Sequence, residues 1–208
     1  MMKWLLLALV TMVPGWARAE IADSSATGFT VKVALTIQAA PDAVYGKLVR
    51  NVGDWWNPMH TFSGDAHNLS IEEKPQGCFC EKLPNGGGVR HLQVLTVAPG
   101  KSLVLSGALG PLQALAATGS LSIDLAAADG GTKLNVTYAV TGYLKSGMNT
   151  FAAPVDTVIT EQFTRLKKYV ERGDAAAKQT TRLQAGARAW RTRGTPRAAP
   201  QTRMPRPA

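Results

Sequence analysis

The chain has 208 residues and a formal net charge of +9, a balance that by itself would suggest nucleic-acid binding. All 14 acidic residues lie within residues 20–174, which hold only 13 of the 23 basic residues, so this part carries a net charge of −1. The excess positive charge lies at the two ends, and this distribution argues against a nucleic-acid-binding domain.

Residues 1–19 have the pattern of a secretory signal peptide. Lys3 precedes an apolar run over residues 4–13, and Ala17-Arg18-Ala19 offers a small-x-small cleavage site. The run has about ten residues, whereas a helix that crosses a membrane needs roughly 20. We therefore expect removal of residues 1–19, a short N-terminal extension over residues 20–27, and export to the periplasm or the extracellular space.

The next residues predict a strand and then a helix. Residues 29–37 alternate apolar and polar side chains, which is typical of a strand with one buried face. Pro41 and Asp42 then predict the start of a helix that ends at about Arg50. Proline suits the first helical turn because the N–H group that it lacks has no partner within the helix there.

After an irregular segment at 54–69, the pattern returns to strands. We expect strands at 77–83, 89–97, 102–106, 118–125 and 133–140, separated by Gly-rich or Pro-Gly turns. Short turns join neighbouring strands in an antiparallel arrangement. The sequence therefore predicts an antiparallel sheet.

Residues 154–172 form the clearest helical pattern in the chain. Apolar residues recur at steps of three and four from Val155 to Val170, and Gly173 stands where a helix terminator is expected. Residues 174–208 are rich in Ala, Arg, Thr, Gln and Pro, so we expect a disordered basic tail. This tail either is an extension without a function of its own or attaches the protein to an anionic membrane surface.

This order of elements resembles the START-like helix-grip superfamily, also called SRPBCC, and local signals agree with its branch of polyketide cyclases and Hsp90-ATPase-activator homologues. The signals are residues 37–45 (IQAAPDAVY), the pair Trp55-Trp56, the glycine-led strand at 77–81, and residues 97–105 (VAPGKSLVL). The resemblance implies an α+β helix-grip domain over residues 28–173. A curved antiparallel sheet would wrap around the long C-terminal helix, and a hydrophobic cavity would lie between them.

The irregular segment DWWNPMHTFSGDAHNL, residues 54–69, falls where the resemblance implies the mouth of that cavity. Large aromatic rings bind apolar ligands at little entropic cost. Because adjacent residues cannot share one environment, we expect one tryptophan of the pair in the core and the other near the pocket. The candidate ligand-binding residues are Trp55, Trp56, Met59, His60, Phe62, Phe79, Glu81, His91, Tyr138 and Phe163.

Polar groups in and near this segment allow several kinds of chemistry. His60, Asp65 and His67 match no metal-ligand spacing, so we expect them to hydrogen-bond the loop backbone and predict neither a metal nor a cofactor. Glu81 and His91 should lie close together if their hairpin pairs symmetrically. They would then form either a proton-transfer pair or an ordinary cross-strand pair.

Cys78 and Cys80 are the only cysteines of the chain. In a regular strand their Cα atoms would lie roughly 6.6 Å apart, near the upper limit for a disulfide, although a bulge would bring them closer. The alternatives are buried thiols, a strained disulfide or two thiolate metal ligands, and we favour the first two.

The favoured function is an exported, monomeric binding protein that holds a small hydrophobic or lipid-like ligand without covalent chemistry, so no catalytic residue is assigned. The alternative is a cyclase- or hydrolase-type enzyme that uses a histidine–carboxylate pair in the same cavity. A protein–protein module, as in the chaperone-activator relatives, fits an exported protein poorly.

Overall fold

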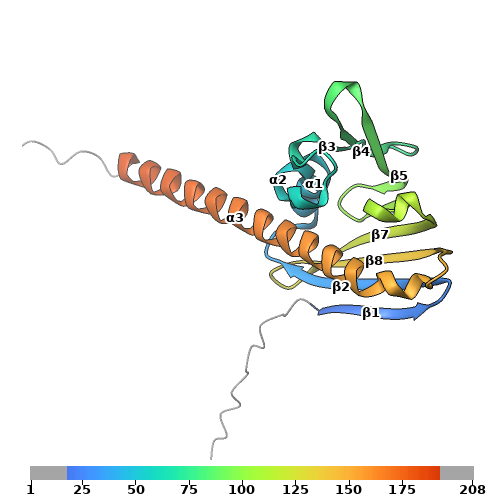
Figure 1. The fold of residues 1–208 in the computed structure, drawn as a ribbon. Helices are drawn as coiled ribbons and strands as arrows, with labels where there is room; N and C mark the ends of the chain where they lie inside the picture. Colours follow the sequence, from blue (N-terminus) through green and yellow to red (C-terminus); the bar gives the residue numbers. More distant parts are fainter. Residues whose placement is uncertain (1–17, 193–208) are drawn as a thin grey trace, which may run out of the picture. The chain divides into compact units, whose positions relative to one another are not determined.

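A computed structural model describes residues 18–192 of the chain, with side chains described over residues 20–173 (Figure 1). The chain divides into two units at the Arg172–Gly173 boundary, and the sheet and the cavity described below belong to the first unit. The predicted signal peptide lies outside the described residues except for Arg18 and Ala19, which begin the first strand. Residues 193–208 of the predicted tail also lie outside them.

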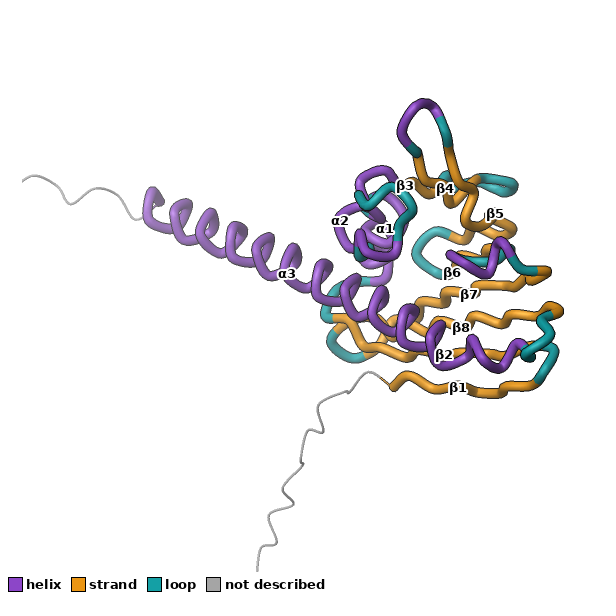
Figure 2. The backbone as a smooth tube through the Cα atoms, viewed as in Figure 1, coloured by secondary structure: helices purple, strands orange, loops and turns teal. Residues whose placement is uncertain are grey.

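The first unit is an α+β arrangement built on one curved antiparallel sheet. Within the described residues it has eight strands in the order β1-β2-β8-β7-β6-β5-β4-β3, and it is not closed, because β1 and β3 form free edges. Figure 2 shows this sheet in orange. The strands are β1 Arg18–Ser25, β2 Gly28–Ile37, β3 Leu69–Ile71, β4 Cys78–Lys82, β5 Gly88–Ala98, β6 Ser102–Ser106, β7 Ala116–Ala128 and β8 Gly131–Tyr143.

The central strands follow the predicted alternation. In β2, Val31, Val33, Leu35 and Ile37 are buried while the residues between them are more exposed, because successive side chains of a strand point to opposite faces. β1 was not predicted. Residues 20–25 of the expected extension, together with Arg18 and Ala19, pair with β2 from Arg18↔Ala34 to Ser25↔Gly28. Its sequence, RAEIADSS, lacks a hydrophobic alternation that would have revealed it.

Strand β5 departs from strict alternation at two places. Phe79 pairs with Leu92 and Cys80 with Arg90, so His91 is an extra residue opposite β4. Likewise Val94 pairs with Leu105 and Thr96 with Val104, so Leu95 is extra opposite β6. Such bulges redirect side chains, and here His91 and Leu92 are both buried although they are consecutive.

Three α-helices accompany the sheet within the described residues: α1 Pro41–Arg50, α2 Val52–Trp55 and α3 Ala152–Thr192. α1 begins at the predicted proline and buries Val44, Tyr45, Leu48 and Val49. In the part of the chain that the structure covers, no helix is long and apolar enough to cross a membrane.

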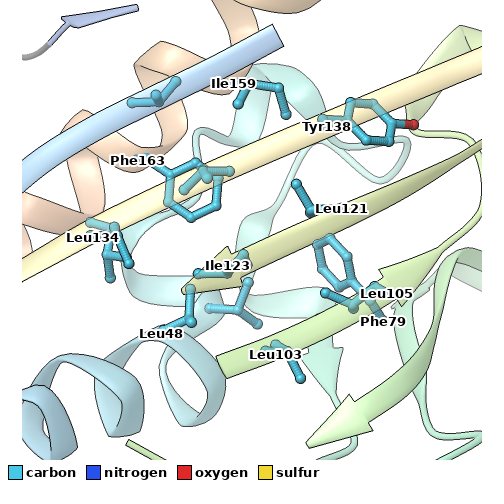
Figure 3. Packing of buried hydrophobic residues seen from close by; sticks show 14 of the residues in the cluster. Leu48, Phe79, Leu103, Leu105, Leu121, Ile123, Leu134, Tyr138, Ile159 and Phe163 are labelled. Carbon is cyan, nitrogen blue, oxygen red and sulfur yellow. The ribbon is translucent and has the colours of Figure 1, made fainter. Parts of the chain in front are cut away.

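The first part of α3 packs on the sheet. Ile159, Phe163, Leu166 and Val170 are buried in one cluster with the inward residues of the strands. Figure 3 shows Ile159 and Phe163 facing Leu134, Leu121 and Tyr138. The stripe of apolar residues in α3 is therefore the contact with the sheet, as its period predicts.

The predicted end of this helix was wrong. The helical backbone passes through Gly173 and continues to Thr192, so residues 174–192 of the expected disordered tail are helical. The reason is that Ala, Arg, Gln and Lys, which dominate this stretch, are strong helix formers. Gly173 and Gly186 each cost the helix about 1 kcal/mol, which such neighbours can offset.

Candidate functional site

A cavity of about 340 Å³ opens between the beginning of α3, strands β5 and β8, and the segment that follows α2. Six predicted residues line it: Trp56, Met59, His60, Phe62, His91 and Tyr138. The sequence analysis missed a second group of lining residues: Leu109, Pro111, Leu112, Phe151, Pro154, Val155, Val158 and Ile159. The wall is mostly apolar, and the volume lies within the range of small-molecule sites.

The other four predicted residues lie behind this wall and are not among the lining residues. Trp55 is in the core, where its ring lies 5.9 Å from that of Phe163 and its Nε1 donates a hydrogen bond to the Leu48 carbonyl. Phe79 packs between Trp56 and His91, with ring centroids 5.4 and 5.2 Å away. The tryptophan pair is therefore divided between core and cavity, and these residues support the site without bordering it.

The mouth segment, residues 55–63, is anchored to α3 on one side. Arg165 Nε donates to the Trp55 carbonyl at 2.8 Å, and the Asn57 amide donates to Gln162 Oε1 at 2.8 Å. Glu161 contacts His60 Nε2 through Oε2 at 3.1 Å and also accepts a hydrogen bond from the Asn57 side chain. Partial burial raises the pKa of Glu161, but these hydrogen bonds outweigh it and hold the pKa below its ordinary value.

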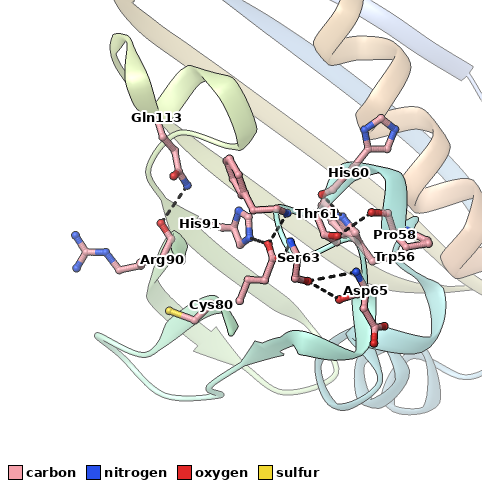
Figure 4. Close-up of polar contacts among 12 residues, drawn as sticks. Trp56, Pro58, His60, Thr61, Ser63, Asp65, Cys80, Arg90, His91 and Gln113 are labelled. Carbon is pink, nitrogen blue, oxygen red and sulfur yellow. Dashed lines mark hydrogen bonds and ion pairs between the residues drawn. The ribbon is translucent and has the colours of Figure 1, made fainter. Parts of the chain in front are cut away.

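On its other side the mouth segment is anchored to Glu81 of β4. This carboxylate is only 1% exposed. It accepts hydrogen bonds from the Phe62 amide at 3.0 Å, from the Ser63 amide, and from His91 Nε2 at 2.9 Å (Figure 4). Burial raises the pKa of Glu81, but the hydrogen bonds from Ser63, Phe62 and His91 are stronger together and leave the pKa below 4.5. Glu81 is therefore an ionised, fully partnered carboxylate at neutral pH.

His91 connects this carboxylate with the cavity. Its ring is 5% exposed and stacks on Phe62 at 5.9 Å between centroids. Burial lowers its pKa below 6.5, and the opposing effect of Glu81 is smaller. His91 is therefore neutral at pH 7, and because an ionised carboxylate only accepts hydrogen bonds, the ring proton is on Nε2.

The remaining polar groups of the wall are used inside the protein. Tyr138 Oη accepts from the Leu109 amide at 3.0 Å and donates to the Gly107 carbonyl at 3.3 Å, and burial raises its pKa to about 12. Trp56 Nε1 donates to the His60 carbonyl at 3.1 Å. Tyr138 thus orders the turn after β6, a role for which its sequence position gave no signal.

The polar residues beyond the mouth form loop contacts. Asp65 accepts hydrogen bonds from the His67 amide at 2.9 Å and contacts its Nδ1 at 3.0 Å, whereas His60 is paired with Glu161. Among the described residues there is no group of three His, Cys, Asp or Glu side chains that could hold a metal ion.

Cys78 and Cys80 are joined by a disulfide, with Cα atoms 5.3 Å apart. This is shorter than the roughly 6.6 Å of a regular strand. The register of β4 and β5 shifts between Phe79 and Cys80, but the extra residue, His91, is on β5 and not on the strand of the cysteines.

Comparisons with known proteins find solved structures with a similar fold, and these give no function for the chain. An uncharacterized protein from Rhizobium leguminosarum is 16% identical over 76% of this chain and 99% of its own, with a TM-score of 0.52. A protein from Rhizobium loti is 20% identical over 67% of this chain and 94% of its own, also with a TM-score of 0.52. No family model and no curated protein matches the chain. The chain therefore shares its fold with uncharacterized bacterial proteins.

Proposed function

We propose that this chain is a START-like protein that holds one small hydrophobic molecule in the cavity between α3 and the sheet, without covalent chemistry. The observation that carries the proposal is the apolar cavity of about 340 Å³, lined by Trp56, Phe151, Val155 and their neighbours. Burial of apolar surface contributes about 25 cal/mol per Å² to binding. A wall of this composition favours an apolar ligand over water.

The anchoring of the mouth supports a cavity that exists before the ligand arrives. α3 holds residues 55–60 through Glu161, Gln162 and Arg165, and Glu81 holds residues 62 and 63. A preformed site avoids the entropic cost of ordering a loop around the ligand.

The volume limits the size of the ligand. One heavy atom occupies about 30 Å³, the share of one molecule in liquid water, so 340 Å³ corresponds to about eleven heavy atoms. The proposed ligand is therefore a small apolar molecule or a single short chain, and a two-chain lipid would protrude from the mouth.

Export is part of the proposal and rests on the signal-peptide pattern of residues 1–19. Cleavage after Ala19 removes only the first two residues of β1, and the pairs from Glu20↔Lys32 to Ser25↔Gly28 remain. Edman sequencing of the protein from its native host should start at Glu20, and a sequence starting at Met1 would contradict export by cleavage.

A series of linear alcohols tests the binding function. Each buried CH₂ contributes about 0.8 kcal/mol, so affinity measured by calorimetry should rise about fourfold per carbon from hexanol and level off near 1-decanol, which has about eleven heavy atoms. Val158→Trp fills the cavity from α3 and should weaken 1-decanol binding at least tenfold. Thr157→Trp is the matched control, because Thr157 is exposed on the same helix and does not line the cavity. Absence of alcohol binding, or equal loss in both variants, would refute the proposal.

A second candidate function rests on the contact between His91 and Glu81 at 2.9 Å. A neutral histidine held by a carboxylate is a suitable general base. No serine or cysteine is among the lining residues, and the Thr61 hydroxyl donates to the Pro58 carbonyl, so water would be the nucleophile. His91→Gln separates the two functions. An acid–base enzyme should lose about 100-fold or more in rate, whereas a binding protein should lose no more than about tenfold in affinity.

A further inference from the structure

Two ring atoms of the lining residues, His60 Nδ1 and His91 Nδ1, have no hydrogen-bond partner among the described residues. The His60 side chain is 33% exposed at the mouth, whereas the His91 side chain is 5% exposed, so His91 Nδ1 is the one held in the cavity wall. Trp56 Nε1, Thr61 Oγ1 and the Tyr138 hydroxyl all donate to backbone carbonyls, and His60 Nε2 is paired with Glu161. His91 Nε2 is taken by Glu81. For His91 Nδ1, no hydrogen-bond partner exists within the part of the chain described, and the atom is not among the fully buried unpartnered ones.

The chemical character of this atom is set by the residues behind it. Glu81 accepts hydrogen bonds from two backbone amides as well as from His91, an arrangement that requires an ionised carboxylate. The proton of His91 is then on Nε2, and Nδ1 carries a lone pair. His91 therefore presents a hydrogen-bond acceptor, and its orientation is fixed by the stacking of Phe62 and by the bulge in β5.

The charges around the cavity also argue against an anionic ligand. The lining residues include no lysine, arginine, aspartate or glutamate. Two carboxylates, Glu81 and Glu161, contact lining histidines from behind, and Arg165 is turned to the backbone carbonyl of Trp55. A ligand carboxylate placed here would lose its hydration without gaining a cation, which is strongly unfavourable.

We propose that the cavity selects an uncharged ligand whose polar end is a hydrogen-bond donor, a hydroxyl or an N–H group, which donates to His91 Nδ1. It rejects a carboxylate of the same size. This inference rests on the proposed binding function and narrows its ligand to alcohols, phenols and amines or amides that are neutral at the working pH, excluding fatty acids.

Three probes of eleven heavy atoms each test the inference on the unmodified protein: 1-decanol, its isomer nonyl methyl ether, and nonanoate. The ether has the same apolar area but only accepts hydrogen bonds. One net hydrogen bond changes affinity by about 3- to 10-fold, so calorimetry at pH 7 should find 1-decanol tighter than the ether by that factor. Nonanoate should bind at least tenfold more weakly than 1-decanol.

His91→Phe removes the acceptor while keeping a flat ring against Phe62 and Phe79. The advantage of 1-decanol over the ether, measured on the same variant, should fall to less than twofold, and this ratio is independent of any change in the affinity for apolar chains in general. His67→Gln is the control, because this exposed histidine is outside the cavity, and it should keep the full advantage. Nitrogen-15 NMR of the wild-type histidines provides a measurement that needs no variant: the His91 ring should be the Nε2–H tautomer, and its Nδ1 signal should move with 1-decanol but not with the ether.

The outcomes separate this inference from the binding function. If none of the probes binds, both are refuted. If the ether binds as tightly as 1-decanol, if nonanoate binds tightest, or if His91 is the Nδ1–H tautomer, the cavity binds small apolar molecules but the donor selectivity is wrong.

Discussion

Glu81→Leu is the substitution that most directly tests how the cavity mouth is held. The carboxylate contacts three donors: the amides of Phe62 and Ser63, and His91 Nε2. Leucine has a similar size but accepts no hydrogen bond. Each donor left without a partner costs about 1 kcal/mol or more, so the three together should lower the free energy of unfolding by about 3 kcal/mol. Removal of a buried charge offsets part of this loss, and solvent access to Ser63 limits it further.

Urea unfolding followed by circular dichroism measures this change. Glu72→Leu is the matched control, because Glu72 lies on the connection from β3 to β4, is exposed, and its side chain has only an ion pair with Lys74, which is worth about 0.5 kcal/mol. Hydrogen exchange should show faster exchange of the Phe62 and Ser63 amides in Glu81→Leu. A loss below about 1 kcal/mol, or unchanged exchange of these two amides, would mean that Glu81 does not anchor the mouth.

Three further predictions concern pH, the cysteines and the core. Burial holds the pKa of His91 below 6.5 in the folded state, so as the pH falls the unfolded state binds a proton before the folded state does. The free energy of unfolding that His91 contributes is therefore fully present above pH 6.5 and is lost as the pH is lowered. Without this histidine, His91→Phe should show a smaller fall in melting temperature from pH 6.5 to about 5. In intact mass spectrometry the native protein should be lighter by two hydrogens than its reduced form, and an unchanged mass on reduction would show free thiols. In urea unfolding, the double variant Cys78→Ser/Cys80→Ser should lose less than about 2 kcal/mol of its free energy of unfolding, because the disulfide closes a very short loop. Phe163→Ala should cost about 3–5 kcal/mol and Met59→Ala, at 83% exposure, less than about 0.5 kcal/mol; similar losses would contradict the division into core and mouth.

The sequence predicted those parts of the fold that depend on one face of one element. The alternation of Val31, Val33 and Leu35 and the helical period from Val155 to Val170 both report burial directly, and the structure has the strand and the helix at these positions. β1 escaped prediction because its residues 20–25 are all exposed, so the strand is defined by its pairing with β2 rather than by buried side chains. The continuation of α3 beyond Gly173 escaped because helix propensity outweighed a single terminator residue.

The candidate site was predictable where it depends on one segment and not where it depends on packing between segments. One short segment of the sequence carries Trp56, Met59, His60 and Phe62, so the mouth could be recognised as a unit. The lining by Leu109, Leu112 and Phe151 arises from loops that meet only in three dimensions. Proximity of Glu81 and His91 was expected from the hairpin, but the bulge beside them was not, because its extra residue is fixed by the register of β5 with two neighbours.

The two bulges of β5 have a consequence for how this strand can change. Side chains of a strand alternate with a period of two, so each extra residue reverses the phase: Val89 and His91 point inward on odd positions, Leu92 and Val94 on even ones, and Val97 on an odd position again. Because Cys80 pairs with Arg90 and Phe79 with Leu92, a deletion of His91 alone would leave a regular ladder in which Val89 keeps its place opposite Glu81. The sheet therefore carries the cavity histidine as an added residue, which can be gained or lost without a change in the register of either end of the strand.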